Sequence, residues 1–139
     1  MPVIPTEAQL GDAAAVIALW QATALTRPWN DPAADFARAL AAADAAVLVV
    51  RDGDSILGSV MVGDDGHRGW VYYLAVAPDR QRRGLGRALM GAAEDWLRAR
   101  NCPKIQLMVR AGNAEALGFY AALGLEQQDV VTLGRRLAP

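Results

Sequence analysis

The 139-residue chain has 53% hydrophobic and 21% charged residues, a composition that suits one compact domain with a single core and excludes a largely disordered chain. Its formal net charge of −1 gives no general reason to expect nucleic acid as a partner. Because it has one cysteine, no apolar run of membrane-spanning length and no signal-peptide pattern, we expect a single cytoplasmic domain over residues 1–139, without a disulfide or a membrane anchor.

The first third of the chain reads as a short strand and two helices. Residues 3–4 predict the strand, and Thr6 followed three residues later by Gln9 resembles a capping box for the first helix. That helix should bury one face, because its apolar residues repeat at helical spacing. They are Leu10, Ala14, Ile17 and Trp20. Asp31 as N-cap and Pro32 at the first helical position begin the second helix.

The rest of the chain is mainly strands, with two more helices among them. Strands are predicted over residues 47–51, 56–62, 70–76, 105–109 and 130–133. A helix over residues 85–100 has an apolar stripe that should be buried. The stripe is Leu85, Leu89, Ala92 or Ala93, and Trp96. The last helix begins at its cap, Asn113, and ends at Gly124. This order predicts an α/β (α+β) fold with a mixed sheet flanked by helices.

The stretch from Val76 to Leu89 joins an apolar strand to a helix through glycines and basic residues. Gly84 and Gly86 remove side chains that would keep a ligand from the backbone. The start of the helix leaves N–H groups unpaired, and the helix dipole favours negative charge there. Arg82, Arg83 and Arg87 add full positive charges. Together these features predict an anion site for phosphate, although glycine and arginine are also common in ordinary loops.

Two other kinds of nucleotide-binding loop are excluded because their sequence motifs do not occur here. A Walker A loop needs the triplet Gly-Lys-Ser/Thr, which does not occur in this chain. A dinucleotide fingerprint needs a third glycine, but Leu89 stands at that position.

Three motifs resemble those of the GNAT acyltransferases. Gln81-x-x-Gly84-x-Gly86 matches the Q/R-x-x-G-x-G/A signature of that family. Residues 113–125 look like its second motif, and residues 74–78 look like its fourth strand. Further stretches resemble a small bacterial subgroup, the YpeA-like acetyltransferases, and together the matches cover nearly the whole chain. These stretches are residues 27–32, 65–69, 72–74, 102–106 and 133–137.

The resemblance implies a GNAT fold, in which a mixed, mostly antiparallel sheet flanked by helices is splayed between strands four and five. It implies an N-acetyltransferase that moves an acetyl group from acetyl-CoA to an amine, by direct attack in a ternary complex and without a metal. The acceptor would be a small molecule or a peptide. The oligomeric state stays open between a monomer and a homodimer, although many relatives pair as dimers. Two alternatives stay open: an acyl-CoA-binding regulatory module without catalysis, and an acyltransferase for a longer acyl-CoA.

By the same resemblance, the basic loop and its neighbours bind CoA. The implied residues are Leu74, Ala75, Val76, Gln81, Arg82, Arg83, Gly84, Leu85, Gly86, Arg87, Asn113, Phe119 and Tyr120. The backbone N–H of Val76, close to a bulge near the end of the fourth strand, would donate to the developing oxyanion. Tyr120 would protonate the leaving thiolate, although its helical spacing also suits a core aromatic residue.

The general base and the acceptor site are less well defined. Ribosomal-protein N-acetyltransferases carry a glutamate on strand five, where this chain has Met108. The remaining candidates for the base, acting through water, are His67, Asp65, Asp64 and Tyr72. His67 can titrate near neutral pH, but a histidine beside a turn also fits a structural role. The implied acceptor-binding residues are Arg27, Trp29, Asn30, Asp31, Asp65 and Tyr72, the first four of which also fit a plain helix–helix connection.

Overall fold

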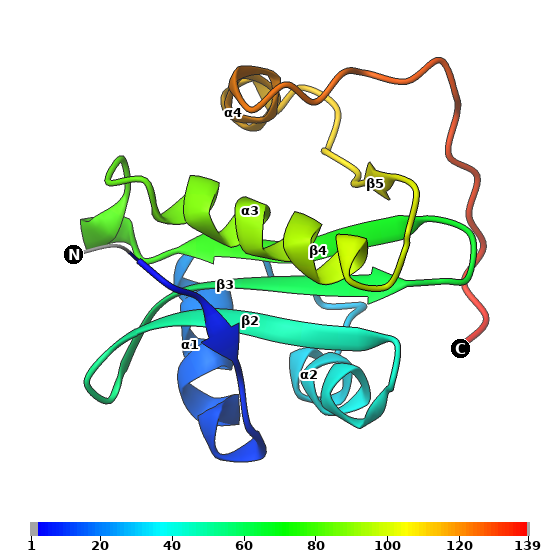
Figure 1. Cartoon of the computed structure of the whole chain (residues 1–139). Coiled ribbons are helices and arrows are strands. Elements are labelled where there is room, and N and C mark those ends of the chain that lie inside the picture. Colours follow the sequence, from blue (N-terminus) through cyan, green and yellow to red (C-terminus); the bar gives the residue numbers. More distant parts are fainter. Residues whose placement is uncertain (1–2, 139) are drawn as a thin grey trace. The chain divides into compact units, whose positions relative to one another are not determined.

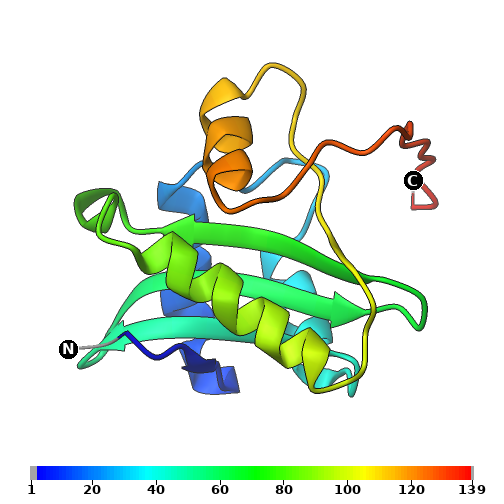
Figure 2. The same cartoon turned by 45° about the horizontal axis from the view of Figure 1, so that its top comes forward.

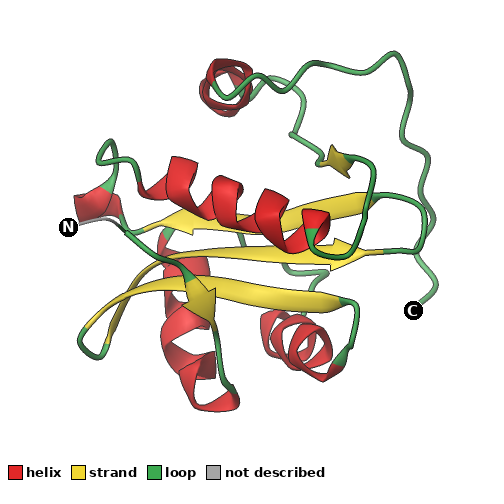
Figure 3. Ribbon diagram, viewed as in Figure 1, coloured by secondary structure: helices red, strands yellow, loops and turns green. Residues whose placement is uncertain are grey.

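The structure, a computed structural model, describes residues 3–138 and contains one five-stranded sheet with flanking helices (Figures 1 and 3). In chain order the elements are β1 (Thr6–Glu7), η1 (Leu10–Asp12), α1 (Ala13–Ala22), α2 (Pro32–Ala41), β2 (Ala45–Asp52), β3 (Ser55–Asp64), β4 (Gly69–Val76), η2 (Pro78–Arg80), α3 (Leu85–Arg98), β5 (Ile105–Gln106) and α4 (Ala114–Ala122). They fall into two compact units, with the boundary between Leu107 and Met108. Within residues 3–138, no helix is long and apolar enough to cross a membrane.

The first unit holds the whole sheet, in the order β1-β2-β3-β4-β5. The first four strands are antiparallel to their neighbours, whereas β5 is parallel to β4. This last pairing covers only Gly69 with Ile105 and Trp70 with Gln106. The predicted mixed, mostly antiparallel sheet is therefore confirmed. Beyond Trp70, the edge of β4 has no strand partner on the β5 side among the described residues.

Helices cover both faces of the sheet (Figures 1 and 2): α1 and α2 pack on one face and α3 on the other. Trp20 of α1 and Phe36 of α2 are fully buried against the first face. The buried stripe of α3 is Leu85, Leu89, Met90, Ala93 and Leu97. The prediction of Trp96 in this stripe is wrong, since Trp96 is only half-buried. Steps of four residues from Leu89 lead to Leu97 instead.

Two glycines let α3 lie close to the sheet. A Cβ atom at Gly58 of β3 would lie 2.9 Å from Leu89 Cδ1, and one at Gly69 of β4 would overlap the Leu97 side chain. Any larger residue would push the helix away. The close approach therefore holds α3, and the loop from which it starts, at the end of β4.

The start of the chain differs from the prediction. The first strand lies at Thr6–Glu7 rather than at residues 3–4. The Asp12 carboxylate accepts the N–H of Gln9 at 2.8 Å, so the capping pair is not Thr6 and Gln9. Leu10 is 71% exposed and Ala14 is exposed as well, because the helix starts later than predicted and its phase changes. The buried residues of α1 are Val16, Leu19 and Trp20.

The end of the chain confirms a helix and contradicts two strands. Asn113 Oδ1 accepts the N–H of Ala116 at 3.1 Å, and Gly124, with φ of 89°, follows the end of α4, as predicted. The strand predicted over residues 105–109 is limited to Ile105–Gln106, and no strand occurs in residues 125–138. Alternating apolar residues favour extended structure, but a strand also needs a partner for its backbone groups.

Candidate active site

A loop at the C-terminal end of β4 carries a row of backbone N–H groups without acceptors. Residues 81–84 connect η2 to α3. Arg82 and Gly84 have φ of 64° and 83°, in the left-handed region, and such turns can gather successive N–H groups into an anion-binding concavity. Among the described residues, no backbone carbonyl accepts from the N–H groups of residues 81–87. The first backbone amide of α3 that is paired is Ala88, which donates to Gly84 at 3.0 Å.

Three arginines give this loop a positive charge that nothing nearby neutralises. Arg82, Arg83 and Arg87 are exposed and form no ion pair within residues 3–138. The contact between Arg80 and Asp79, at 3.9 Å, is largely exposed and therefore weak. Leu85 is buried, so only its backbone can contact a ligand bound at the loop. Unpaired amides together with unpaired arginines suit a ligand with several negative charges.

The backbone of Val76 faces the open edge of β4. The N–H of Ala77 donates to the Leu57 carbonyl of β3 at 2.8 Å. The carbonyl of Val76 shares that peptide plane and points the opposite way, where it accepts Gln81 Nε2 at 3.2 Å. In an extended residue the N–H points to the same side as the carbonyl. The N–H of Val76 is therefore directed away from β3, toward the edge that β5 leaves uncovered.

A bulge in β4 lies three residues before Val76. Ser59 of β3 pairs with Ala75, but Met61 pairs with Tyr72, so Tyr73 and Leu74 together oppose one residue of β3. Tyr73 has φ of 54°, which is rare for a bulky residue. The prediction of a bulge in this strand is confirmed, at Tyr73 and Leu74. Because of the bulge, the adjacent tyrosines 72 and 73 both face the α1 and α2 side of the sheet.

Four side chains meet at this bulge, and the sequence analysis did not identify them as a group. The Tyr73 ring stacks on Trp20, with centroids 3.8 Å apart and an interplanar angle of 10°. Its hydroxyl donates to Asp35 Oδ2 at 2.7 Å. Ser59 Oγ donates to the Tyr73 carbonyl at 3.0 Å and accepts Trp20 Nε1 at 2.9 Å. Burial, followed by the bond to Asp35, raises the pKa of Tyr73 well above its ordinary value. The adjacent tyrosines, which break the alternation of a strand, were the available signal.

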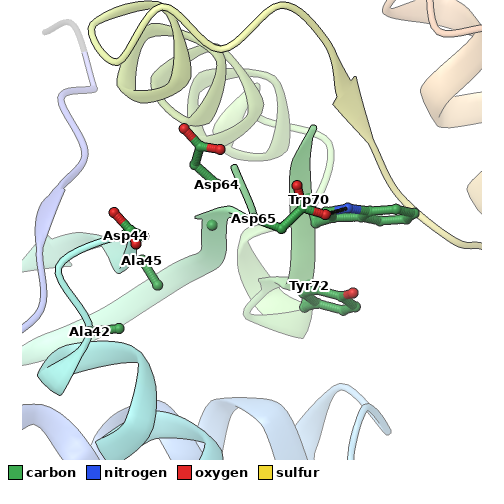
Figure 4. Close-up of a pocket in the computed structure, with 8 residues that line it drawn as sticks. Ala42, Asp44, Ala45, Asp64, Asp65, Trp70 and Tyr72 are labelled. Atoms are coloured by element: carbon green, nitrogen blue, oxygen red, sulfur yellow. Dashed lines mark hydrogen bonds between the residues drawn. The ribbon is translucent and has the colours of Figure 1, made fainter. Parts of the chain in front are cut away.

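An acidic hollow of about 400 Å³ opens at the other end of β4 (Figure 4). Its lining residues are Ala42, Asp44, Ala45, Gly63, Asp64, Asp65, Trp70 and Tyr72. The side chains of Trp70 and Tyr72 lie one above the other on the same side of β4. No basic residue lines the hollow, and no group of acidic, histidine and cysteine side chains in residues 3–138 is arranged to hold a metal ion. The hollow joins the predicted acceptor residues Asp65 and Tyr72 to Asp44, Asp64 and Trp70, which were not predicted to bind the acceptor.

The Asp65 carboxylate is held in place by three donors. Oδ1 accepts the N–H groups of His67 and Arg68 at 2.8 and 2.7 Å, and Oδ2 accepts Trp70 Nε1 at 3.0 Å. The backbone donors, first Arg68 and then His67, lower the pKa of Asp65, so it stays charged in acid. Burial, together with the nearby charge of Asp65, raises the pKa of Tyr72. Asp65 is thus a poor proton acceptor and a fixed negative charge.

The other predicted acceptor and base residues do not line this hollow. His67 lies in the turn between β3 and β4, with Nδ1 3.5 Å from Arg68 Nη1. Arg27 Nη1 donates to the carbonyls of Ala24 and Thr26 at 2.7 and 2.9 Å. Asp31 caps α2 by accepting the N–H of Ala34 at 3.1 Å. Trp29, which is 50% exposed, and Asn30 lie in the same connection. The structure therefore places residues 27–31 and the hollow as separate groups.

The second unit carries the remaining predicted residues on or beside α4. Phe119 and Tyr120 form an edge-to-face pair, with centroids 5.1 Å apart and an interplanar angle of 72°. Burial raises the pKa of the Tyr120 phenol. Met108, at the position of the expected glutamate, is 54% exposed.

Comparisons with known proteins give consistent results. The sequence model of the Acetyltransferase (GNAT) family matches residues 15–125. An acetyltransferase of Pectobacterium atrosepticum is 49% identical over 126 residues, which cover 91% of this chain and 89% of the relative. An acetyltransferase of Yersinia enterocolitica is 46% identical over 129 residues, with 93% and 92% covered.

Among solved structures, AAC(6')-Iy in complex with the bisubstrate analogue CoA-S-monomethyl-acetylneamine matches with a TM-score of 0.83. The match covers 99% of this chain and 100% of that chain at 16% identity. At that identity the likeness concerns the fold.

Proposed function

The chain belongs to the GNAT family of acetyltransferases, and from this premise we propose that it transfers an acetyl group from acetyl-CoA to an amine, by direct attack in a ternary complex. The observation that carries the proposal is the row of unpaired N–H groups at residues 81–87 beside three unpaired arginines. The family match runs from residue 15 to residue 125, across both compact units. This supports our proposal that residues 1–139 act as one catalytic domain.

The donor would bind along the C-terminal half of β4. The pyrophosphate of CoA would accept hydrogen bonds from the backbone N–H groups of residues 81–87. Arg82, Arg83 and Arg87 would add positive charge, whereas the buried Leu85 would contribute only its backbone. The pantetheine arm would follow the open edge at Leu74, Ala75 and Val76, where backbone groups lack a strand partner. A related fold binds a CoA-containing bisubstrate analogue, which fits this assignment.

The thioester carbonyl would be polarised by the N–H of Val76. As the amine attacks, negative charge develops on the carbonyl oxygen, and a fixed donor stabilises that charge better than mobile water does. The N–H points toward the uncovered edge, where the pantetheine arm would lie. The side chain of Val76 takes no part in the step.

Tyr120 is our candidate for protonating the leaving CoA thiolate. A phenol is protonated at neutral pH, as an acid must be before it acts, and burial raises the pKa of Tyr120 further in that direction. Asn113 and Phe119, the other family-motif residues of this unit, would contact the pantetheine arm. Asn113 is also committed to capping α4, and Phe119 packs edge-to-face on Tyr120.

The acceptor amine would bind in the acidic hollow. The Asp65 carboxylate and two aromatic side chains, with the charges of Asp44 and Asp64 nearby, suit a cationic molecule, which would place a second, neutral amine near the thioester. Tyr72 and Val76 are four residues apart on β4, at most about 13 Å in an extended strand. Asp65 would bind the cationic group of the acceptor rather than act as the general base. We propose His67, two residues further along the turn, as the base, acting through water.

Residues 27–31 complete the proposed acceptor side. Arg27, Trp29, Asn30 and Asp31 form the connection between α1 and α2, and these helices pack on the sheet face that Tyr72 and Tyr73 share. A small-molecule acceptor fits the volume of the hollow, and a peptide end would need this connection as well.

A thermal-shift titration with acetyl-CoA, CoA and NAD tests the donor site. A ligand at ~100 times its dissociation constant stabilises the native state by ~2.7 kcal/mol, and we expect this shift with acetyl-CoA and CoA but not with NAD. The absence of a shift with both CoA species would refute the proposal. A thiol-release assay over a panel of amines then tests turnover. Binding without turnover would favour the regulatory module, and turnover only with longer acyl-CoA would favour the other alternative.

A single substitution tests the acid. Tyr120→Phe should lower kcat by about a hundredfold while leaving CoA affinity and thermal stability nearly unchanged, because only the phenolic proton is lost. Leu117→Ala is the matched control, since it changes an exposed residue of the same helix but removes no proton. Unchanged kcat in Tyr120→Phe would refute the role of Tyr120 as the acid and leave it a packing role.

A further inference from the structure

The extra residue in β4 decides the direction in which the Val76 N–H points. Every second residue of β3, including Leu57, Ser59 and Met61, directs its backbone N–H and carbonyl groups toward β4. Tyr72, the partner of Met61, therefore faces β3. In a regular strand every second residue faces the same edge, so Val76, four residues later, would face β3 too. The extra residue at Tyr73 and Leu74 reverses this, and Val76 faces the open edge.

The backbone at the bulge is not in a conformation that its own residue prefers. Tyr73 has φ of 54°, and a bulky side chain rarely adopts the left-handed region unless surrounding contacts impose it. Glycine, which would adopt it freely, is absent from this turn of the strand. Something outside β4 must therefore hold the bulge.

Contacts from three other elements converge on Tyr73. Trp20 of α1 stacks on its ring, and Asp35 of α2 accepts its hydroxyl proton at 2.7 Å. Ser59 of β3 donates to its carbonyl at 3.0 Å, so ring, hydroxyl and backbone are all restrained. Trp20 and Ser59 are completely buried and bonded to each other at 2.9 Å.

We propose that Trp20, Asp35, Ser59 and Tyr73 form a positioning cluster for acyl transfer, which holds the β4 bulge so that the Val76 N–H faces the thioester carbonyl. The proposal rests on the function proposed above, and it adds four residues that touch neither CoA nor the reacting atoms. Ser59 is the central member, because its hydroxyl alone bonds both the bulge carbonyl and the Trp20 ring.

The test compares three hydroxyl-removing variants. Ser59→Ala removes the bond to the bulge carbonyl, and Tyr73→Phe keeps the stacked ring but loses the bond to Asp35. Thr23→Ala is the matched control. Its hydroxyl donates to the Leu19 and Trp20 carbonyls at 2.8 and 3.2 Å, within the helix that carries Trp20, and neither bond involves β4.

The decisive readout is the infrared carbonyl band of acetyl-CoA labelled with ¹³C at the thioester carbonyl, measured free and bound. A hydrogen bond from Val76 should lower the band in the wild type and in Thr23→Ala. In Ser59→Ala the band should return toward that of free acetyl-CoA, and kcat should fall at least about tenfold with unchanged CoA affinity. Tyr73→Phe should move both quantities the same way by a smaller amount.

Four outcomes decide the proposal. If Ser59→Ala binds acetyl-CoA with the wild-type band and kcat, the positioning role is overturned. If Ser59→Ala does not fold, Tyr73→Phe carries the same test, and wild-type values there overturn the role. If the wild type itself does not bind acetyl-CoA, the proposed function fails and the positioning role falls with it. A wild-type complex with an unshifted band refutes Val76 as the donor, and the positioning role that depends on it is overturned as well.

Discussion

The two ends of β4 differ in charge and in how far their polar groups are satisfied. At the C-terminal end, residues 81–87 present backbone N–H groups without protein acceptors, and the arginines there are unpaired. At the N-terminal end the charge is negative, and Asp65 alone accepts three hydrogen bonds, two from its own turn and one from Trp70 of β4. We proposed that an anion completes the first end, whereas at the second end hydrogen bonds within the protein already hold the Asp65 carboxylate. We therefore expect substitutions at the two ends to separate donor binding from acceptor binding.

The largest effect should come from a pair of glycines, one at each end. Gly84 and Gly66 have φ of 83° and 88°, and a Cβ at either would meet no atom within 4 Å. Valine imposes the same backbone strain of about 1–3 kcal/mol at both sites. Gly84→Val should turn loop N–H groups away from the ligand and weaken CoA binding about tenfold to a hundredfold, measured by calorimetry. Gly66→Val should leave CoA binding unchanged, and equal weakening by both would contradict the assignment of the loop.

The next effect concerns the acidic end. Replacing Asp64 and Asp65 together by asparagine removes two of the three carboxylate charges at this end of β4 with little change in shape. KM for a cationic amine should rise about three- to tenfold, while KM for acetyl-CoA stays the same. Asp79→Asn, an exposed carboxylate at the basic end, is the control and should leave the amine KM unchanged. A rise in KM for acetyl-CoA in the double variant would show that the ends are not separable.

A smaller effect is expected from single arginines. Arg82→Ala should weaken CoA binding only about two- to fivefold, because the charge is exposed and backbone N–H groups remain. The difference from wild type should shrink as salt rises from 0.05 to about 0.5 M, since screening removes exposed charge interactions. Arg68→Ala, in the turn at the acidic end, is the control. A loss as large as that of Gly84→Val would mean that side chains, not the backbone, hold the anion.

The smallest effect is a change of stability with pH at Asp65. Its pKa is lowered in the folded protein, so the charged form stabilises the fold above the ordinary carboxyl pKa of about 3.9. That contribution is lost as the pH falls through the lowered folded pKa. Between pH 6 and pH 2, Tm of the wild type should therefore fall further than Tm of Asp65→Asn. Parallel curves for the two proteins would contradict the hydrogen bonds of this turn.

Local patterns carried much of the prediction. The caps at Asp31 and Asn113 and the start of α3 after Gly84 were predicted from a few adjacent residues, and the structure has them. These features depend on residues within four positions of one another, so a local sequence pattern is enough to predict them. Errors appeared where a partner was needed, as at residues 130–133, where apolar alternation indicated a strand but no described strand forms.

The candidate sites differ in the same respect: one is built from adjacent residues and the others from residues far apart in the sequence. The spacing of Gln81, Gly84 and Gly86 indicated the anion loop and the family, because a run of adjacent residues builds that loop. The hollow joins residues 42–45 to residues 63–72, and the bulge cluster joins Trp20 and Asp35 to Ser59 and Tyr73. No short-range pattern marks such contacts, because sheet pairing and helix packing bring distant residues together. By itself the sequence determined the loop, the helix caps and the family. The tertiary structure decided the acidic hollow and the direction of the Val76 N–H, since both depend on the register of β3 against β4 and on the helices packed against that pair.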